Sequence, residues 1–349
     1  MKNLQNKIPL ISIIIPCRNE ERFIGKCLDS ILNQNYPKDK LEILVVDGMS
    51  EDNTRNKIEE IKNRHQDKDI RILDNPDKIT PKAMNIGIKS SKGDIVVLVC
   101  AHGFLDKEFL KWNVYHFNKI KKADAVGGKL SAISEDKLLS KAISFVSDSV
   151  FGSGGVRYRQ RTNNGFIRDT LPFCAYRKES FDKFGMIDES FLRGQDGELN
   201  LRILKMGGLI YFSPKIKSYA YSRPSICGFC KQQFQYGYFK VKIAQKLGMM
   251  SVFRQYVPAI FVLSLILSGI LGIFFQPFFY LLIIILLAYL LLNIVFSLEI
   301  AFKKGFKYLP ASIVTFFVLH FGYGLGFLKG IFDFLILKKK VKKDIGITR

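Results

Sequence analysis

The feature that most constrains this chain is a run of 44 residues, Gln255–Leu298, without one charged side chain. As a continuous helix this run would be about 66 Å long, roughly twice the ~30 Å hydrocarbon core of a bilayer. Gln276 and Pro277 lie in its middle, where proline interrupts a helix. The length excludes a single buried core helix, so we predict two membrane spans joined by a tight turn.

A further uncharged stretch, Tyr308–Leu328, is also long enough to cross a bilayer, but Gly322, Gly324 and Gly326 weaken it as a simple helix. Basic residues flank the hairpin on both sides, which places both of its ends in the cytosol by the positive-inside rule. A third crossing would carry the lysines of residues 338–343 outside. We therefore expect the third segment to be re-entrant or interfacial, in a multi-pass protein of the plasma (inner) membrane.

The charge balance is strongly basic, with 53 Lys and Arg against 31 Asp and Glu, a formal net charge of +22. Such a balance suits nucleic acid, an anionic membrane or a phosphorylated substrate. The long apolar segments favour membrane lipids, and the chain lacks the signatures of zinc fingers, basic zippers and RNA-binding domains. We expect no nucleic-acid partner. Cys227 and Cys230 form a lone CxxC, which does not predict a zinc site.

The first two hundred or so residues alternate apolar runs with helical patterns. The apolar runs, typical of buried parallel strands, are Ile11–Pro16, Leu41–Val46, Ile70–Leu73 and Ile95–Val99, with helices expected at Glu20–Gln34, Asp52–Lys62 and Pro81–Ser90. This order predicts an α/β fold with a mostly parallel sheet, in which ligands bind at the carboxyl ends of the strands. The polar stretches at those ends are Cys17–Glu20, Asp47–Ser50, Asp74–Asn75 and Cys100–His102.

Two of these stretches contain recognisable motifs. The first strand runs into Pro16-x-x-Asn19-Glu20, and the second ends in Asp47-x-x-Ser50-x-Asp-x-Thr. A carboxylate at a strand end, followed by small polar residues, suits hydrogen bonds to a base or a ribose. With both motifs on consecutive strand ends, the chain resembles family 2 glycosyltransferases of the GT-A fold, which is Rossmann-like and mostly parallel. Gly48 stands where many members have a second Asp, so the identity of the base stays open.

The chain also resembles the branch of this family that makes succinoglycan-type exopolysaccharides, and the resemblance covers roughly residues 11–250. The matching stretches are Asn75-Pro76, Thr80-Pro81, Ala83–Gly87, Val126–Gly128, Gly152–Arg159 and Asp169–Arg177. The resemblance implies an inverting hexosyltransferase that moves a sugar from a nucleotide-sugar, with a UDP-sugar expected, to a lipid-linked saccharide. The product would be an exopolysaccharide or another cell-surface glycan. The nucleotide-sugar contacts that it implies are Pro16, Arg18, Asn19, Glu20, Asp47, Ser50, Asn75 and Asn85.

Two acidic residues, Asp196 and Glu198, lie at the start of a predicted helix. From the residues alone, acidic helix caps are the better interpretation. The resemblance implies instead that Asp196 is the general base, although Gln195 replaces the Glu that usually precedes it. Glu198 and Arg202 match the helical pattern that follows as catalytic support, with Arg202 pairing an acid one turn back.

The resemblance also predicts a metal-binding motif at the fourth strand end, typically Asp-Ala-His in this branch. This chain has Cys100-Ala101-His102. The change removes a hard oxygen ligand suited to Mg²⁺ or Mn²⁺, while His102 still offers a ring nitrogen. Whether the reaction requires a divalent metal therefore stays open.

A glycine-rich basic segment, Gly152–Arg161, lacks the Gly-Lys-Ser/Thr of a Walker-type phosphate loop. Arg157 and Arg159 are candidate contacts for a diphosphate, either that of the donor or that of a lipid-linked acceptor. An exposed loop that only adds charge fits the sequence equally well.

These patterns predict four regions: a GT-A domain in residues 1–230, a basic amphipathic interfacial linker in 231–254, a membrane region in 255–337 and a basic tail in 338–349. The membrane region comprises the hairpin 255–298 and the third apolar segment 308–328. Two other functions stay open. A catalytically impaired nucleotide-sugar-binding or scaffold protein is motivated by Cys100 and Gln195. A processive polysaccharide synthase is disfavoured because no Gln-x-x-Arg-Trp motif is present.

Overall fold

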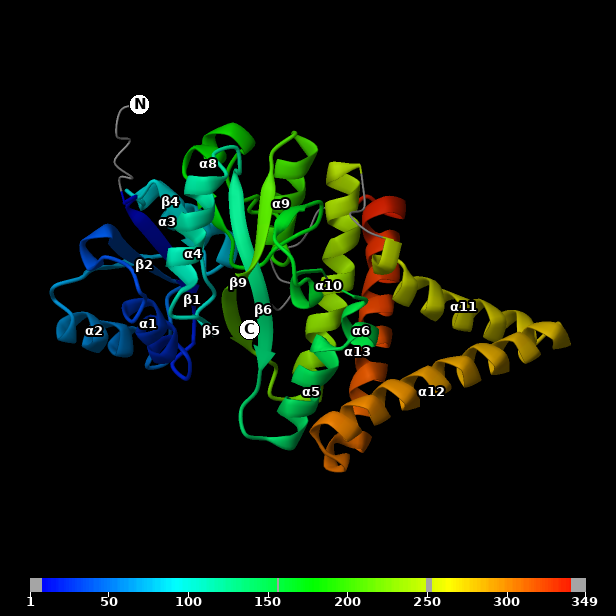
Figure 1. The fold of residues 1–349 in the computed structure, drawn as a ribbon. Coiled ribbons are helices and arrows are strands. Elements are labelled where there is room, and N and C mark those ends of the chain that lie inside the picture. The colour runs from blue at the N-terminus through cyan, green and yellow to red at the C-terminus, as the bar shows by residue number, and fades with distance from the viewer. Residues whose placement is uncertain (1–7, 156, 249–252, 340–349) are drawn as a thin grey trace. The chain divides into compact units, whose positions relative to one another are not determined.

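The computed structural model describes residues 8–155, 157–248 and 253–339, without the side chain of Arg157 (Figure 1). Two compact units share the chain. The first comprises the residues up to Ser131 together with Arg157–Ala220, and the second comprises Ala132–Val156 together with the residues from Tyr221 onward. The predicted domains were contiguous in sequence, whereas the second unit includes a segment from the middle of the chain.

The first unit is built on a nine-stranded sheet in the order β3-β2-β1-β4-β8-β6-β9-β5, with β7 paired to β9. The strands are β1 (Ile11–Cys17), β2 (Leu41–Asp47), β3 (Asp69–Asp74), β4 (Ile95–Leu98), β5 (Gly103–Leu105), β6 (Ala125–Ile133), β7 (Gly165–Ile167), β8 (Ala175–Arg177) and β9 (Ile210–Tyr221). Strands β1 to β4 are parallel, as predicted. The pairs β4–β8, β5–β9, β6–β8 and β7–β9 run antiparallel.

Helices cover both faces of this sheet, because consecutive residues of the central strands point to opposite sides. On β1, Ile13 belongs to one buried cluster with α1 (Ile24–Leu32), α2 (Thr54–Arg64) and α4 (Phe109–Lys119). Its neighbour Ile14 belongs to another cluster with α3 (Thr80–Ser90), α8 (Glu179–Phe184) and α9 (Gln195–Lys205). Burial on both faces explains why the strand sequences are continuously apolar.

One carboxylate, Glu42 of β2, is buried within the parallel sheet. The hydroxyl of Ser12 and the backbone N–H groups of Lys92 and Gly93 donate to it, and Arg71 forms an ion pair with it. Burial alone would raise the pKa of Glu42, but these hydrogen bonds and the Arg71 charge outweigh burial and lower the pKa. The ionised form of Glu42 therefore stabilises the fold.

We expect Glu42→Gln to destabilise the protein by about 1–3 kcal/mol at neutral pH, because the donors around it lose a charged acceptor. Since the folded pKa lies below the ordinary value of 4.5, the stabilisation by Glu42 is complete above that value and is lost as pH falls through the folded pKa. Thermal unfolding in detergent at neutral and acid pH should show that the variant loses less stability on acidification than the wild-type protein does. Glu60→Gln, on the exposed face of α2, is the control. If the wild-type protein and Glu42→Gln lost equal stability on acidification, ionised Glu42 would not stabilise the fold.

The second unit is helical. Its helices are α5 (Leu138–Asp148), α6 (Val150–Ser153), α10 (Ile226–Leu247), α11 (Val257–Gly272), α12 (Gln276–Lys304) and α13 (Leu309–Gly330), with a π-helical turn at Ile331–Ile336. Figure 1 shows α11 and α12 as a hairpin, with Pro277 in the first turn of α12. The predicted break at Gln276-Pro277 is therefore confirmed.

Helix α5 belongs to the core of this helical unit. Its buried residues Ala142, Ile143 and Val146 form one apolar cluster with Phe229 of α10 and with apolar side chains of α12 and α13. The amphipathic pattern of α5 thus buries its apolar face against the C-terminal helices, which explains why Ala132–Val156 leaves the first unit.

The glycines of the third apolar segment form a helix contact. Gly322, Gly326 and Gly330 of α13 face the backbone of α10, and a Cβ atom at Gly326 would come within 2.0 Å of the carbonyl oxygen of Phe234. Small residues at this spacing let two helix backbones approach closely. Residues Leu309–Gly330 form a continuous helix despite Gly322, Gly324 and Gly326, and the close contact with α10 offsets the low helical propensity of Gly322 and Gly326.

Two stretches, Gln276–Lys304 and Phe306–Ile336, are long and apolar enough to cross a membrane, and Val257–Gly272 is a shorter apolar helix. The 16 residues of α11 span about 24 Å, less than the ~30 Å hydrocarbon core. Large apolar side chains such as Ile284, Leu287 and Leu291 of α12 are exposed. Such a surface suits contact with lipid, whereas the re-entrant placement of the third segment stays a prediction.

Candidate active site

Three of the four polar strand ends lie side by side. In the parallel register Cys17 of β1 is opposite Asp47 of β2, and Asp47 is opposite Asp74 of β3. The N–H of Gly48 donates to the carbonyl of Cys17 at 2.8 Å, and the N–H of Asn75 donates to the carbonyl of Asp47 at 2.8 Å. The sheet edge predicted from the sequence is therefore assembled by strand pairing.

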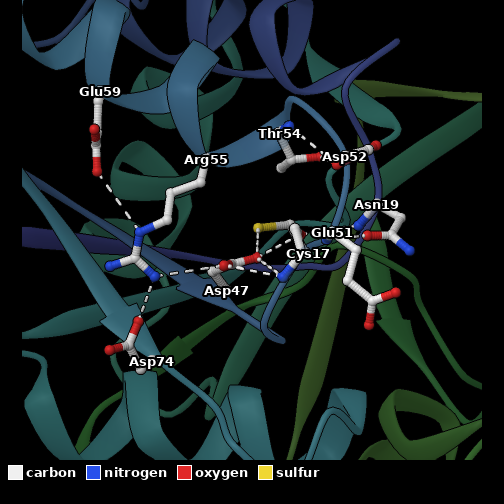
Figure 2. Close-up of polar contacts among 10 residues, drawn as sticks. Cys17, Asn19, Asp47, Glu51, Asp52, Thr54, Arg55, Glu59 and Asp74 are labelled. Carbon is white, nitrogen blue, oxygen red and sulfur yellow. Dashed lines mark hydrogen bonds and ion pairs between the residues drawn. The ribbon is translucent and has the colours of Figure 1, made fainter.

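Asp47 is buried at the centre of this edge (Figure 2). The hydroxyl of Ser50 donates to its Oδ1 at 2.5 Å, and the N–H of Ser50 lies 3.3 and 3.2 Å from its two oxygens. The guanidinium of Arg55 lies 3.6 Å from Asp47 Oδ2 and 2.5 Å from Asp74 Oδ1. The carboxylate is thus fixed in orientation and partly neutralised by a cation that the sequence reasoning did not single out.

The two sequence motifs hydrogen-bond to each other. The N–H of Asn19 donates to Ser50 Oγ at 3.0 Å, and the side-chain oxygen of Asn19 accepts from the N–H of Glu51 at 2.9 Å. The N–H of Glu20 donates to Thr54 Oγ1 at 2.7 Å. Asn19 has a φ of 53°, in the left-handed region that Asn tolerates. These contacts set the shape of both loops.

The other predicted contacts on the first strand end differ in exposure. Pro16 is buried within β1, whereas Arg18 is exposed and lies 3.3 Å from Glu51 Oε1. An exposed ion pair of this kind contributes little to stability, so Arg18 can exchange its partner at small cost.

Glu20 pairs with His102 across the strand ends. His102 Nδ1 lies 3.1 Å from Glu20 Oε1, and the Glu20 side chain is buried. Burial of the imidazole lowers its pKa, but Cys100 and Glu20 beside it outweigh burial and raise the pKa of His102 to about 9. His102 therefore adds a basic ring to the strand-end edge, beside the buried carboxyl group of Glu20.

These side chains do not fit a site for a hard divalent cation. Within residues 8–155, 157–248 and 253–339, no three His, Cys, Asp or Glu side chains come together as a metal site. Cys100 supplies a thiol where an oxygen ligand is expected, and His102 is engaged with Glu20. Mg²⁺ and Mn²⁺ prefer oxygen donors, so the chemistry of this donor set disfavours both ions.

We expect the wild-type protein to keep its activity in EDTA, within about twofold, because the part of the chain that the structure describes contains no oxygen-rich ligand set. Cys100→Asp supplies the missing carboxylate and should make activity respond to added Mn²⁺. Cys227→Asp, which changes an exposed thiol, should behave as the wild-type protein does. Measuring transfer by all three proteins with EDTA, and then with Mn²⁺, checks this. Loss of wild-type activity in EDTA would show that the ligand set forms only with the donor bound.

The two predicted asparagines have different surroundings. Asn75 is buried, its amide donates to the carbonyl of Ile79 at 2.9 Å, and its Oδ1 has no hydrogen-bond partner among the described residues. Asn85, on α3, donates to the carbonyl of Ile187 at 2.9 Å and accepts from the N–H of Ile187 at 3.1 Å. Asn75 therefore has an acceptor available for a ligand, whereas Asn85 holds the loop that precedes α9.

Helix α9 begins after Gly194, which has a φ of 72°, and Asp196 lies in its first turn. Asp196 Oδ1 accepts from the N–H of Gly197 at 2.8 Å, and the residue is partly exposed. Burial and the nearby charge of Asp196 raise the pKa of Cys174. A carboxylate held at a helix N-terminus and open to solvent can accept a proton from a bound hydroxyl.

Glu198 and Arg202 form the predicted pair one turn apart. Glu198 is fully buried, and Arg202 donates to both of its oxygens, at 3.0 and 2.9 Å. Arg202 also donates to the carbonyls of Phe184 and Met186. The pair ties α9 to the preceding segment, so it supports Asp196 by positioning the helix.

The basic segment is only partly described. The side chain of Arg157 lies outside the described residues, and the guanidinium of Arg159 lies 5.5 Å from the ring centroid of Tyr158. Arg161 donates to the carbonyls of Asn163, Asn164 and Phe166. Arg161 therefore stabilises the turn that leads into β7.

Comparison with known proteins decides the family. The sequence profile described as glycosyl transferase family 2 matches residues 12–185. A glycosyltransferase of Methanococcus voltae is 32% identical over 329 residues, which cover 92% of this chain and 97% of the relative. The chain belongs to glycosyl transferase family 2. Its activity is therefore that of a glycosyltransferase, and its α/β fold is of the GT-A type.

Other members of the family agree over similar lengths. The succinoglycan biosynthesis protein ExoA of Rhizobium meliloti is 25% identical and covers 92% of this chain and 95% of its own. This confirms the predicted resemblance to the succinoglycan branch. The mannosyltransferase PcManGT of Pyrobaculum calidifontis, solved with GDP-Man and Mn²⁺, superposes with a TM-score of 0.59 at 16% identity, covering 93% of this chain and 88% of that one. This likeness supports the fold.

Proposed function

We propose that this family 2 member is a membrane-bound, inverting transferase that moves a sugar from a UDP-sugar to a lipid-linked saccharide. The product would belong to an exopolysaccharide or another cell-surface glycan. The transferase unit would lie on the cytoplasmic face of a multi-pass membrane protein, where nucleotide-sugars are available. The observation that carries this proposal is the ordered strand edge around Asp47. Ser50 fixes the orientation of the Asp47 carboxylate, Arg55 lies beside that carboxylate, and His102 lies beside Glu20.

The role of general base proposed for Asp196 is implied by the family resemblance and is supported by its partial exposure and its place at the start of α9. The carboxylate takes the proton of the acceptor hydroxyl while the hydroxyl oxygen forms a bond to the anomeric carbon. The bond from that carbon to the diphosphate breaks on the opposite side, so the configuration inverts. Cations near the leaving diphosphate stabilise the charge that develops there, and the described candidates are His102 and Arg55.

A lipid-linked acceptor is supported by two observations. The relative from Methanococcus voltae is named a dolichyl N-acetyl-alpha-D-glucosaminyl phosphate 3-beta-D-2,3-diacetamido-2,3-dideoxy-beta-D-glucuronosyltransferase, so by its name it acts on a lipid-linked sugar phosphate. This chain also has helices apolar enough to reach the bilayer where such an acceptor resides. Neither observation identifies the sugar that is transferred.

A screen of radiolabelled nucleotide-sugars tests the proposal. Membranes containing the wild-type protein should move label from one donor into the organic-solvent-extractable lipid fraction, and membranes containing Asp196→Asn should not. Label that appears only as free sugar, or in no fraction with any donor, would contradict a lipid-linked acceptor. If the wild-type protein binds UDP but transfers nothing, the second candidate, a nucleotide-sugar-binding scaffold, gains support. Cys100 motivates that candidate, because it stands where the family resemblance implies a metal-binding Asp.

Membrane topology has its own test. A single cysteine reporter placed after Lys343 should be labelled only after permeabilisation if the third apolar segment does not cross. Labelling from the outer face of intact cells would show that it does.

A further inference from the structure

The first unit has an aromatic surface that the candidate active site does not use. Its rings are Trp112 and Tyr115 of α4, Phe166 of β7 and Tyr211 of β9. The ring centroids of Trp112 and Tyr115 lie 5.4 Å apart, and those of Phe166 and Tyr211 also lie 5.4 Å apart. His116 joins the two pairs, because its ring lies 5.1 Å from Tyr115 and 5.1 Å from Tyr211. The rings therefore form one continuous surface, on which Tyr115 and Phe166 are 47% and 40% exposed.

Three lysines lie over these rings. The distances from Nζ to the ring centroid are 4.1 Å for Lys215 and Trp112, 5.2 Å for Lys122 and Phe166, and 5.9 Å for Lys119 and Tyr115. All three lysines are exposed, and none has an acidic ion-pair partner within residues 8–155, 157–248 and 253–339. We call the three lysines and the four rings the aromatic-lysine patch. All of it belongs to the first unit, and acidic side chains do not balance its charge.

A buried histidine beneath the patch responds to this charge. His116 is 3% exposed, and neither of its ring nitrogens has a hydrogen-bond partner among the described residues. Burial lowers the pKa of His116, and the charges of Lys119 and Lys215 lower it further. The electrostatic potential at this surface is therefore positive, as expected for lysines without acidic partners.

We propose that the aromatic-lysine patch binds the headgroups of anionic phospholipids. Each lysine close to an anionic lipid surface contributes about fivefold to the binding constant, so three unpaired lysines contribute about a hundredfold. Tryptophan and tyrosine rings have an apolar body and a polar edge, and they concentrate where lipid headgroups meet water. The patch thus offers both the charge and the ring chemistry that a headgroup layer accommodates.

Other occupants fit this surface less well. Two copies of the patch would repel each other, because each carries unpaired positive charge. Nucleic acid shares the negative charge and would also stack on aromatic rings. However, the same chain has helices apolar enough to cross a bilayer, so lipid headgroups are the anionic surface at the highest local concentration. The charge and the apolar helices together favour lipid.

Tryptophan fluorescence tests the proposal directly, because Trp112 is the only tryptophan of the chain. The full-length protein is placed in two kinds of liposome that contain phosphatidylcholine and phosphatidylglycerol in equal amounts. In one kind the phosphatidylglycerol has brominated acyl chains, which quench tryptophan on contact, and in the other kind the phosphatidylcholine has them. Brominated phosphatidylglycerol should quench Trp112 more strongly than brominated phosphatidylcholine. High salt should remove this difference, because it screens the lysine charges.

A triple variant isolates the contribution of the lysines. Lys119→Gln, Lys122→Gln and Lys215→Gln together should lower binding of the anionic lipid about a hundredfold, and the two brominated lipids should then quench Trp112 equally. Lys38→Gln, Lys62→Gln and Lys89→Gln together make the same change in net charge at exposed sites elsewhere in the first unit, and should keep the wild-type preference. The midpoint of thermal unfolding reports whether each variant has folded.

Three results would overturn the inference. Equal quenching of the wild-type protein by both brominated lipids would show that the patch does not select anionic headgroups. Absence of quenching by brominated phosphatidylglycerol would show that the patch does not contact lipid. A change in Trp112 fluorescence on addition of nucleic acid, without a preference for anionic lipid, would assign the patch to nucleic acid. The assay contains neither donor nor acceptor, so its outcome does not depend on the proposed sugar transfer.

Discussion

Asp196→Asn is expected to lower the rate of sugar transfer by about a thousandfold or more while UDP binding stays unchanged. The amide cannot accept the proton of the acceptor hydroxyl, and a positioned general base contributes roughly 10²–10⁴ to a rate. Asparagine keeps a side-chain oxygen that can accept from the N–H of Gly197, so the helix start should be preserved. The measurement is single-turnover transfer with saturating donor, beside calorimetric titration of UDP.

Asp182→Asn is the matched control, because Asp182 is an exposed carboxylate on the neighbouring helix α8. It should transfer sugar at the wild-type rate. Near-normal turnover by Asp196→Asn would exclude Asp196 as the general base. Its role would then be that of an acidic cap of helix α9. Loss of both transfer and UDP binding would instead indicate damage to the fold.

Arg202→Ala is expected to destabilise the protein by about 3–5 kcal/mol, because it leaves Glu198 fully buried without its cation. The carbonyls of Phe184 and Met186 lose their donor at the same time. The midpoint of thermal unfolding in detergent should fall clearly. Activity measured well below that midpoint should fall as well, since the pair holds the helix that carries Asp196.

Two comparisons make this prediction specific. Lys205→Ala removes an exposed cation from the last turn of the same helix and should change stability by less than about 1 kcal/mol. A double variant with Leu at positions 198 and 202 should be more stable than Arg202→Ala, because no unpaired charge remains. If Arg202→Ala destabilised the protein no more than Lys205→Ala does, the buried pair of Glu198 and Arg202 would contribute little to stability.

Local pattern predicted the parallel half of the fold well. Strands such as Ile11–Cys17 are buried on both faces, so their apolar character is continuous and visible in the sequence. The antiparallel half was not predicted, because β5, β7 and β8 have only three residues each and show no periodicity. The family relationship supports the predicted activity, whereas the roles of the individual site residues stay predictions.

Two contacts of the site that sequence reasoning missed join segments that only the pairing of the strands brings together. Arg55 reaches Asp47 and Asp74 only because β2 and β3 pair in parallel with their acids opposite each other. The available signal in the sequence was Arg55 itself, a basic residue that directly follows the second motif at the start of a helix. The pairing of His102 with Glu20 joins residues far apart in the chain, so no local sequence pattern predicts it.

The packing of α5 against the C-terminal helices bears on how the enzyme can be handled in the laboratory. A chain shortened before α10 would lose the apolar helices, and the buried faces of Ala142, Ile143 and Val146 would then be open to water. Such a protein is expected to aggregate even though its first unit keeps the whole strand-end edge around Asp47. A water-soluble version would need polar replacements on α5 as well as removal of the tail, since the apolar C-terminal helices are part of the fold of the second unit.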